Sequence, residues 1–324
     1  MLFNQLHALW HPACYHGWGR SKRFFEGWYY KLVSANEAHA FAIIPGIAMD
    51  ENGQQQAFIQ VLDGKNDTAW YHRFPVEDFR PTPKKHALWI GDNFFSEEKI
   101  ILDLPQLKGE ISFEETVPWS CSLLSPGIMG PFSFVPFMEC YHGILSMNHG
   151  LKGELCFKEE NISFSKGLGY TEKDWGHSFP AGYIWMQSNH FSTPGTSVKA
   201  SMAIIPWLGS SFIGHIAGVL FNGKLYEFTT YNGTKVKQCL ITEKMVKIEM
   251  ENRQFRLSLH AKRDQATSLA APIAGFMDAR IEESMKATIE VGLFDKKTNA
   301  FLLKDKGSSA GIEVAGDHSR LLKN

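Results

Sequence analysis

Short stretches in which apolar and polar residues alternate follow one another along most of the chain, separated by glycine, asparagine, aspartate and proline. Alternation with a period of two is typical of β-strands. Helical periodicity over more than ten residues is hard to find. We expect strands at residues 23–33, 38–47, 55–63, 86–95, 99–107, 183–191, 198–207, 212–221, 224–232, 246–253, 255–263, 284–294 and 311–317. The pattern predicts an all-β protein built from sandwiches or barrels.

Two windows lack Asp, Glu, Lys and Arg, namely Val117–Met138 and Ser201–Phe221. The first holds four prolines, which a continuous helix would not tolerate. The second reads as two buried strands joined by the turn at residues 208–211. Because the proline-rich window lies near the middle of the chain, we expect two β units, residues 1–150 and 151–324. Two barrels side by side would leave a cleft between them and a cavity within each.

Composition narrows the functional classes. The 324 residues are 44% hydrophobic and 21% charged, with a net charge of -1, so the chain should fold and has no basic surplus for binding nucleic acid. Five scattered cysteines favour a reducing compartment over a disulfide framework. The N-terminal stretch has neither a basic start nor an unbroken apolar region, so we expect no signal peptide. We therefore expect a cytoplasmic protein, with peripheral membrane contact as a way to reach an oily ligand.

One acid stands in an aromatic row in the first strong strand. Alternate residues of an extended strand share a face, so Phe24, Glu26, Trp28 and Tyr30 should point the same way. Glu26 could then face a cavity as a catalytic carboxyl. In the alternative, this segment is an edge strand and Glu26 pairs with a nearby Lys or Arg.

The segment 169–191 places further carboxyl groups beside aromatic residues. In an extended Tyr170–Trp175, alternation puts Glu172 and Asp174 on the face of Tyr170 and leaves Lys173 and Trp175 on the other. The alternative is a structural corner in which one of the two acids caps a turn and Trp175 fills the floor of a barrel.

The strand that follows aligns two amides with three aromatic residues. The aligned side chains are Tyr183, Trp185, Gln187, Asn189 and Phe191. Buried amides need hydrogen-bond partners. Gln187 and Asn189 could therefore bind a hydroxyl of a ligand or close a gap in the backbone hydrogen bonding.

A third acid, Glu139, lies with His142 in the apolar segment 130–143. A carboxyl there is costly unless it is paired or protonated. In the alternative, Glu139 bonds to His142 or to the backbone and holds a crossover. His11, Cys14 and His16 have tolerable spacing for a metal, but no second ligand pair follows, so we expect no metal site. No dinucleotide fingerprint and no G-x-S-x-G elbow occur.

Three blocks together resemble the tocopherol cyclase family: FFEGWYYKL (24–32), GPFSFVPFMECYHG (130–143) and GYTEKDWGHSFPAGYIWMQSNHF (169–191). Their order and spacing are similar to the family, and the match runs on to GIEVAGD at 311–317. The family looks related to lipocalin-like proteins that include carotenoid hydratases and lipid-linked stress proteins. The resemblance implies two tandem lipocalin-like antiparallel β-barrel domains with a site near their junction.

The resemblance also implies a reaction. A prenylated hydroquinone is protonated at a trisubstituted alkene, and the phenolic oxygen captures the tertiary cation to close a chromanol ring, with no cofactor and no metal. Such chemistry needs a buried, protonated carboxyl and aromatic faces beside the cation. The open alternatives are a non-catalytic carrier of lipids or isoprenoids, a stress protein, and an isoprenoid hydratase.

The roles of single residues rest on the alternation argument. We expect Glu172 or Asp174 to be the acid, with Glu26 and Glu139 as rivals. The aromatic lining of the cation's path would be Trp28, Trp175, Tyr183 and Trp185. The quinol hydroxyl would be oriented by Gln187, Asn189 or His142.

Overall fold

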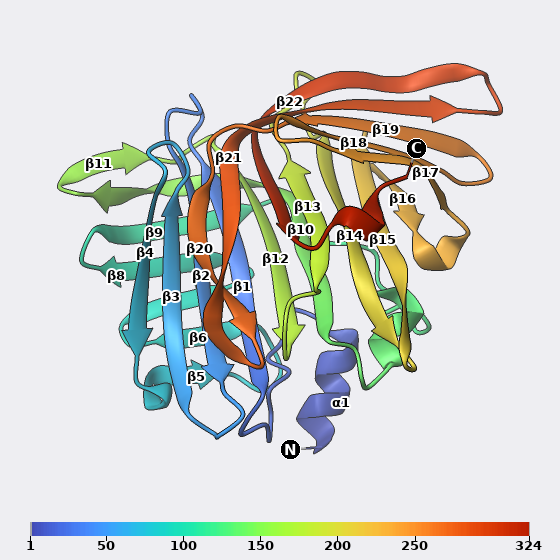
Figure 1. Cartoon of the computed structure of the whole chain (residues 1–324). Coiled ribbons are helices and arrows are strands. Elements are labelled where there is room, and N and C mark those ends of the chain that lie inside the picture. Colours follow the sequence, from blue (N-terminus) through green and yellow to red (C-terminus); the bar gives the residue numbers. More distant parts are fainter. Residues whose placement is uncertain (1, 324) are drawn as a thin grey trace. The chain divides into compact units, whose positions relative to one another are not determined.

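The computed structural model describes residues 2–323, and β-strands dominate it (Figure 1). One α-helix, α1 (Leu2–Trp10), precedes the strands. The 3-10 helices are η1 (Val76–Asp78), η2 (Gly130–Phe134), η3 (Thr230–Asn232) and η4 (Ser319–Leu321). Within residues 2–323 there is no helix with the length and apolar character needed to cross a membrane.

The strands form two large antiparallel sheets. Those of the first sheet are β1 (Phe24–Val33), β2 (Ala40–Met49), β3 (Gln55–Asp63), β4 (Thr68–Phe74), β5 (Phe79–Pro81), β6 (Ala87–Ile90), β7 (Asn93–Ser96), β8 (Lys99–Leu104), β9 (Leu107–Glu114), β10 (Cys140–Phe157), β11 (Glu160–Ser163) and β12 (Leu168–Gly176). Their spatial order is β4-β3-β2-β1-β12-β10-β9-β8-β7-β6-β5, with β11 on β10.

The second sheet holds the remaining strands. They are β13 (Gly182–Ser188), β14 (Ser197–Trp207), β15 (Ser210–Phe221), β16 (Lys224–Thr229), β17 (Lys235–Ile241), β18 (Met245–Glu251), β19 (Phe255–Lys262), β20 (Thr267–Ile273), β21 (Phe276–Asp295) and β22 (Ala300–Gly316). Their spatial order is β16-β15-β14-β13-β22-β21-β19-β18-β17, with β20 on β21. The expected pair of strands in Ser201–Phe221 is confirmed as β14 and β15, which join through Leu208 and Gly209.

Each sheet curls around a hydrophobic cluster of its own. In the first sheet, β3 contacts β6 although the two strands lie far apart in the strand order. Phe41, Phe95 and Ile111 are among the side chains of the cluster that this sheet encloses. In the second, Phe228 of β16 and Cys239 of β17 join one cluster although these strands are the two ends of the order. The expected all-β class, with two lipocalin-like antiparallel β-barrels, is confirmed.

The two compact units divide the chain differently from the expected boundary. One unit holds the residues up to Phe179 together with Leu269–Arg280, and the other holds Pro180–Ser268 and the residues from Ile281 onward. Residue 150 falls inside β10, which stays paired with both β9 and β12. The proline-rich window, in turn, is a loop of the first unit that contains η2.

The hairpin of β20 and β21 brings a distant piece of sequence into the first unit. Its turn residue Gly275 accepts a hydrogen bond from the N–H of Met49 (2.9 Å) and donates one to the carbonyl of His177 (2.6 Å). Gly275 has a φ of 90°, and a Cβ there would lie 2.1 Å from the carbonyl oxygen of Met49. Only glycine fits this close approach of two backbones.

Candidate functional site

The candidate site lies on β12 and its neighbours β1 and β10. Glu26 of β1 is opposite Trp175, and Trp28 is opposite Lys173. On the other side, His142 of β10 is opposite Asp174. The expected alternation along β12 is confirmed, since Glu172 and Asp174 share one face and Lys173 and Trp175 share the other, which packs on the hydrophobic cluster of the first unit.

Four ionisable side chains meet on the face of β12 and β10 that points away from this cluster. We call Tyr170, Glu172, Asp174 and His142 the His142 cluster. Nδ1 of His142 lies 2.7 Å from Oδ1 of Asp174, and Nε2 lies 3.5 Å from Oε2 of Glu172. The hydroxyl of Tyr170 donates a short hydrogen bond to Oε2 of Glu172. One imidazole therefore lies between two carboxyl groups.

The side chains of the His142 cluster differ in how far they are exposed to water. The side chain of Glu172 is 5% exposed, that of His142 is 13% and that of Asp174 is 27%. Burial, and then the negative charge of Glu172, raise the pKa of Tyr170 well above its ordinary value, so its hydroxyl keeps its proton and remains a donor. Such an arrangement can pass a proton between an enclosed carboxyl and a more exposed one.

The same side chains are also the best-placed set for a metal among residues 2–323. One ligand atom from each of His142, Glu172 and Asp174 lies within 4.8 Å of the others. An imidazole with two carboxylates is a donor set that several divalent cations accept. A test of any function at this site must therefore include a chelator.

A second group of polar side chains lies on the opposite, core-facing side of β12. We call Glu26, Lys173, His16, Trp28 and Trp175 the Lys173 cluster. Nζ of Lys173 is 2.5 Å from Oε1 of Glu26, and both side chains are 0% exposed. The ammonium lies 4.6 Å from the ring centre of Trp28 and 4.9 Å from that of Trp175.

The chain before β1 completes the Lys173 cluster. The N–H of His16 donates to both oxygens of Glu26 at 2.9 Å, and the N–H of Gly17 donates to Oε2 at 3.1 Å. Lys173 donates to the carbonyls of Pro12 (3.0 Å) and Cys14. Every charge in this cluster has several close partners, as a buried ion pair requires.

These partners determine the protonation state of Glu26. Burial alone would raise the pKa of its carboxyl, but Lys173 and His16 outweigh this and hold the pKa below its ordinary value. Burial, together with Lys173, lowers the pKa of His16 to about 4, so its ring is neutral and Nδ1 can accept from the ammonium at 2.8 Å. Glu26 is therefore an ionised structural carboxylate, unsuited to donate a proton. The ion-pair alternative is confirmed, although β1 is a central strand and not an edge.

The structure also relocates two of the expected aromatic residues. Trp28 and Trp175 do not flank Glu172, because alternation places them on the core-facing side around Lys173. Trp175 stacks on His16 with 4.0 Å between ring centres, and Nε1 of Trp28 donates to the carbonyl of Ala13 (3.0 Å). Both hold the cation and the N-terminal segment in place.

Glu139 lies just before β10 and outside the His142 cluster. Burial raises the pKa of its carboxyl. Within the described part of the chain, its buried Oε2 has no hydrogen-bond partner. The alternative in which Glu139 bonds to His142 does not hold, because His142 contacts Asp174 and Glu172 instead. Glu139 therefore has the properties of a second acid that can stay protonated.

The other predicted binding residues belong to the second unit. Tyr183, Trp185 and Gln187 are buried on the face of β13 opposite to Ile184 and Met186, which belong to the hydrophobic cluster. The hydroxyl of Tyr183 donates to Oε2 of Glu313 on β22 at 2.7 Å. Asn189 follows β13, and its Oδ1 lies 3.0 Å from Nδ1 of His190.

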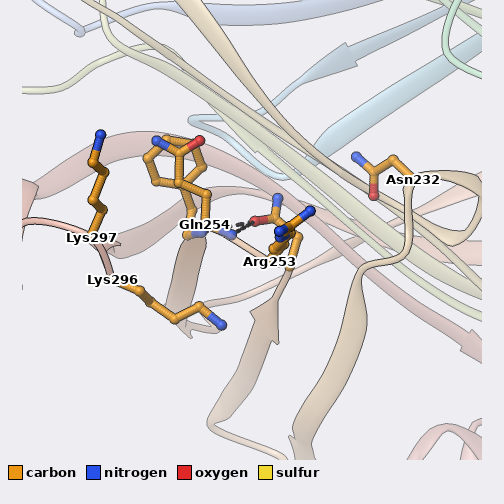
Figure 2. Close-up of a pocket in the computed structure, with 7 residues that line it drawn as sticks. Asn232, Arg253, Gln254, Lys296 and Lys297 are labelled. Atoms are coloured by element: carbon orange, nitrogen blue, oxygen red, sulfur yellow. Dashed lines mark hydrogen bonds between the residues drawn. The ribbon is translucent and has the colours of Figure 1, made fainter.

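A separate pocket of the second unit has a different character. Figure 2 shows it among the turns after β18 and β21, with Arg253, Lys296 and Lys297 as its charged side chains. The ring of Phe255 and three amide side chains complete the lining: Asn232, Asn252 and Gln254. The pocket is polar and cationic, and none of the predicted site residues lines it.

Two residues of the clusters were not among the predicted site residues. Tyr170 shares the face of Glu172 two positions earlier, so the alternation argument alone could have included it. Lys173 stood between the two predicted acids, and its buried pairing with Glu26 depends on a neighbouring strand that sequence alone does not identify.

Comparisons with known proteins agree with this architecture. The tocopherol cyclase-like family matches residues 119–316. The chloroplastic tocopherol cyclase of Zea mays is 22% identical to this chain, in an alignment that covers 93% of this chain and 77% of the maize protein. A probable chloroplastic tocopherol cyclase of Oryza sativa subsp. japonica shows the same values.

Solved structures share the fold at low identity. CghA in complex with Sch210972 has a TM-score of 0.58 and 10% identity, over 90% of this chain and 88% of its own. A putative AttH protein from Nitrosomonas europaea has a TM-score of 0.53 and 14% identity, over 90% and 92%. The strand order, the segments 130–143 and 169–191 and the family match lead to one conclusion: this chain belongs to the tocopherol cyclase-like family.

Proposed function

We propose that this protein is an enzyme that closes a chromanol ring in a prenylated hydroquinone. The observation that carries the proposal is the His142 cluster, in which one imidazole lies 2.7 Å from one carboxyl oxygen and 3.5 Å from another. Membership in the tocopherol cyclase-like family supports this reaction class, and the cluster offers groups that can transfer a proton.

The reaction is an isomerisation whose protons balance. A proton adds to the less substituted carbon of the alkene, the tertiary carbon becomes a cation, and the phenolic oxygen forms a C–O bond to it. The phenolic proton then leaves. The site must therefore give one proton and take one back, with no electron transferred.

Glu172 is our choice for the acid. It is the most enclosed carboxyl of the cluster, and the cation it creates must be kept from water. His142 lies within 3.5 Å of a carboxyl oxygen of both Glu172 and Asp174, so the cluster offers a route for a proton between the two carboxyl groups. After the transfer, the Tyr170 hydroxyl would stabilise the Glu172 carboxylate. His142 and the more exposed Asp174 would restore the proton.

The aromatic and amide side chains of the second unit remain our candidates for binding the substrate. Tyr183 and Trp185 offer ring faces, which stabilise cations by about 0.5–2 kcal/mol each. Gln187 and Asn189 offer amides for a hydroxyl, and the prenyl chain requires a hydrophobic surface. Glu139 is the rival acid.

The test is to incubate the purified protein with a prenylated benzoquinol in deuterium oxide. We expect a chromanol with one deuterium on the carbon next to the new C–O carbon, and the same yield with a chelator present. Glu172→Gln should abolish the product, whereas the matched exposed variant Glu160→Gln should not.

Each other outcome assigns a different function. A product heavier by one water would identify a hydratase, and tight binding without conversion would identify a carrier. Loss of product on chelation would make the cluster a metal site. Full turnover by Glu172→Gln together with loss in Glu139→Gln would move the acid to Glu139.

A further inference from the structure

Large hydrophobic side chains are exposed on one part of the first unit. On α1, Phe3 is 66% exposed and Leu6 is 52% exposed. In the loop from 121 to 137, Leu123 and Leu124 are 75% and 76% exposed. Phe134 (41%) and Phe137 (52%) belong to the same loop segment. Monomeric proteins rarely expose so many large apolar side chains without a partner.

Trp10 joins α1 to this loop, and we call the exposed hydrophobic side chains of the two segments the α1–loop patch: Phe3, Leu6, Leu123, Leu124, Phe134 and Phe137. Phe3, Leu6 and Trp10 are spaced by three and four residues and so share a face of the helix. Nε1 of Trp10 donates to the carbonyl of Leu123 (3.0 Å), and its ring lies edge-on to Phe134 with 5.8 Å between centres. The helix is thus anchored beside the exposed leucines.

The patch itself carries no charge. Neither α1 nor Val117–Met138 contains Asp, Glu, Lys or Arg. Charged side chains lie beside the helix and not on it, since Lys84 acts on His7 and Glu97 acts on His11. Two adjacent leucines that project almost fully into solvent, with aromatic rings beside them, match the acyl region of a lipid surface.

We propose that the α1–loop patch docks this protein on the surface of a lipid bilayer. Leu123 and Leu124 insert among the acyl chains, and Phe3, Leu6, Phe134 and Phe137 lie at the interface. The docking rests on the proposed function in one respect, since a prenyl quinol dissolved in a membrane would reach the enzyme there. Because the inserted surface is uncharged, binding does not depend on anionic lipids and persists at high salt.

The experiment measures cosedimentation of the full chain with phosphatidylcholine vesicles, in 0.1 M and 0.5 M NaCl. We expect binding at both salt concentrations, and a loss of at least tenfold in affinity for Leu123→Ser/Leu124→Ser. The matched control is Leu208→Ser, because Leu208 is 79% exposed in the turn between β14 and β15 of the second unit. The control should bind like the unmodified protein.

Several results would overturn the proposal. One is absence of binding by the unmodified protein, and another is equal binding by the double variant. Binding that needs anionic vesicles and is lost in Lys296→Gln/Lys297→Gln would place the contact on the cationic pocket of Figure 2. A change from dimer to monomer in the double variant, with vesicle binding unchanged, would make the patch a contact between copies of this chain.

The failure of docking can be told apart from the failure of the proposed function. The double variant should convert a short-chain prenyl quinol dispersed in water at the normal rate. It should convert a prenyl quinol supplied in vesicles slowly. Glu172→Gln should behave in the opposite way, with normal vesicle binding and no conversion from either source.

Discussion

The two faces of β12 carry clusters that look alike in sequence and differ in chemistry. Both place a carboxyl group next to nitrogen-containing side chains in a strand rich in aromatic residues. On the core-facing side, Glu26 and Lys173 are fully enclosed and 2.5 Å apart. On the opposite side, Glu172 and Asp174 face an imidazole, and Asp174 is partly exposed.

The difference lies in whether a proton can leave. A lysine ammonium with several close acceptors fixes the negative charge of Glu26, and neither member has a path to water. An imidazole can accept a proton at one ring nitrogen and donate one from the other, and the partly exposed Asp174 links the His142 cluster to solvent. A buried acid is therefore not in itself evidence of catalysis, because its partner decides what it does.

The largest effect should follow from breaking the core-facing pair. Lys173→Met leaves the Glu26 carboxylate buried without its cation, and we expect a loss of about 3–5 kcal/mol in the free energy of unfolding. Unfolding in guanidinium chloride measures this. The double variant Lys173→Met/Glu26→Gln should recover part of the loss, because it removes the uncompensated charge. A loss below about 1 kcal/mol in the single variant would contradict the structural role.

A substitution in the His142 cluster, on the opposite face of β12, should lower turnover and leave stability nearly unchanged. Glu172→Gln keeps the shape of the side chain and an acceptor for Tyr170 but removes the acid, so we expect a drop in kcat of about 10²–10⁴-fold. The free energy of unfolding should change by less than about 1 kcal/mol. If stability fell as far as in Lys173→Met while turnover persisted, the two faces would not differ in the way described.

A smaller effect is expected for the more exposed carboxyl. Asp174→Asn keeps an oxygen acceptor but removes the negative charge that lies 2.7 Å from Nδ1 of His142, and we expect a drop in kcat of about tenfold with KM unchanged. Steady-state kinetics separate the two constants. A rise in KM at constant kcat would instead assign Asp174 to substrate binding.

The last effect is gradual and concerns pH and the core-facing side. Burial lowers the pKa of His86, which stacks on Trp28, from 6.5 to about 3. As the pH falls below 6.5, His86 binds a proton in the unfolded chain but stays neutral in the folded chain. Stability should therefore decrease between pH 6.5 and about 3 by up to about 1.4 kcal/mol per unit from this histidine. His86→Gln should reduce that slope, as measured by urea unfolding at pH 7.5, 5.5 and 4.5. An unchanged slope would show that His86 is not buried as a neutral ring.

The strand alternation explains why part of the candidate site could be predicted. The pairing of Glu172 with Asp174 on one face, and of Glu26 with Trp28 on another strand, follows from a period of two that each strand carries locally. It could not show which face of β12 meets the hydrophobic cluster, and so it could not tell that Trp28 and Trp175 surround Lys173.

By itself, the sequence determined the all-β class, most of the strands and which residues share a face, because propensity and alternation act between near neighbours. Only the tertiary structure decided that Lys173 neutralises Glu26, that His142 of β10 lies between two carboxyls of β12, and that Leu269–Arg280 joins the first unit. These outcomes depend on strand order and register, which bring together residues as far apart in sequence as Met49 and Gly275. Such contacts are selected by the packing of the whole sheet and leave no local pattern in the chain.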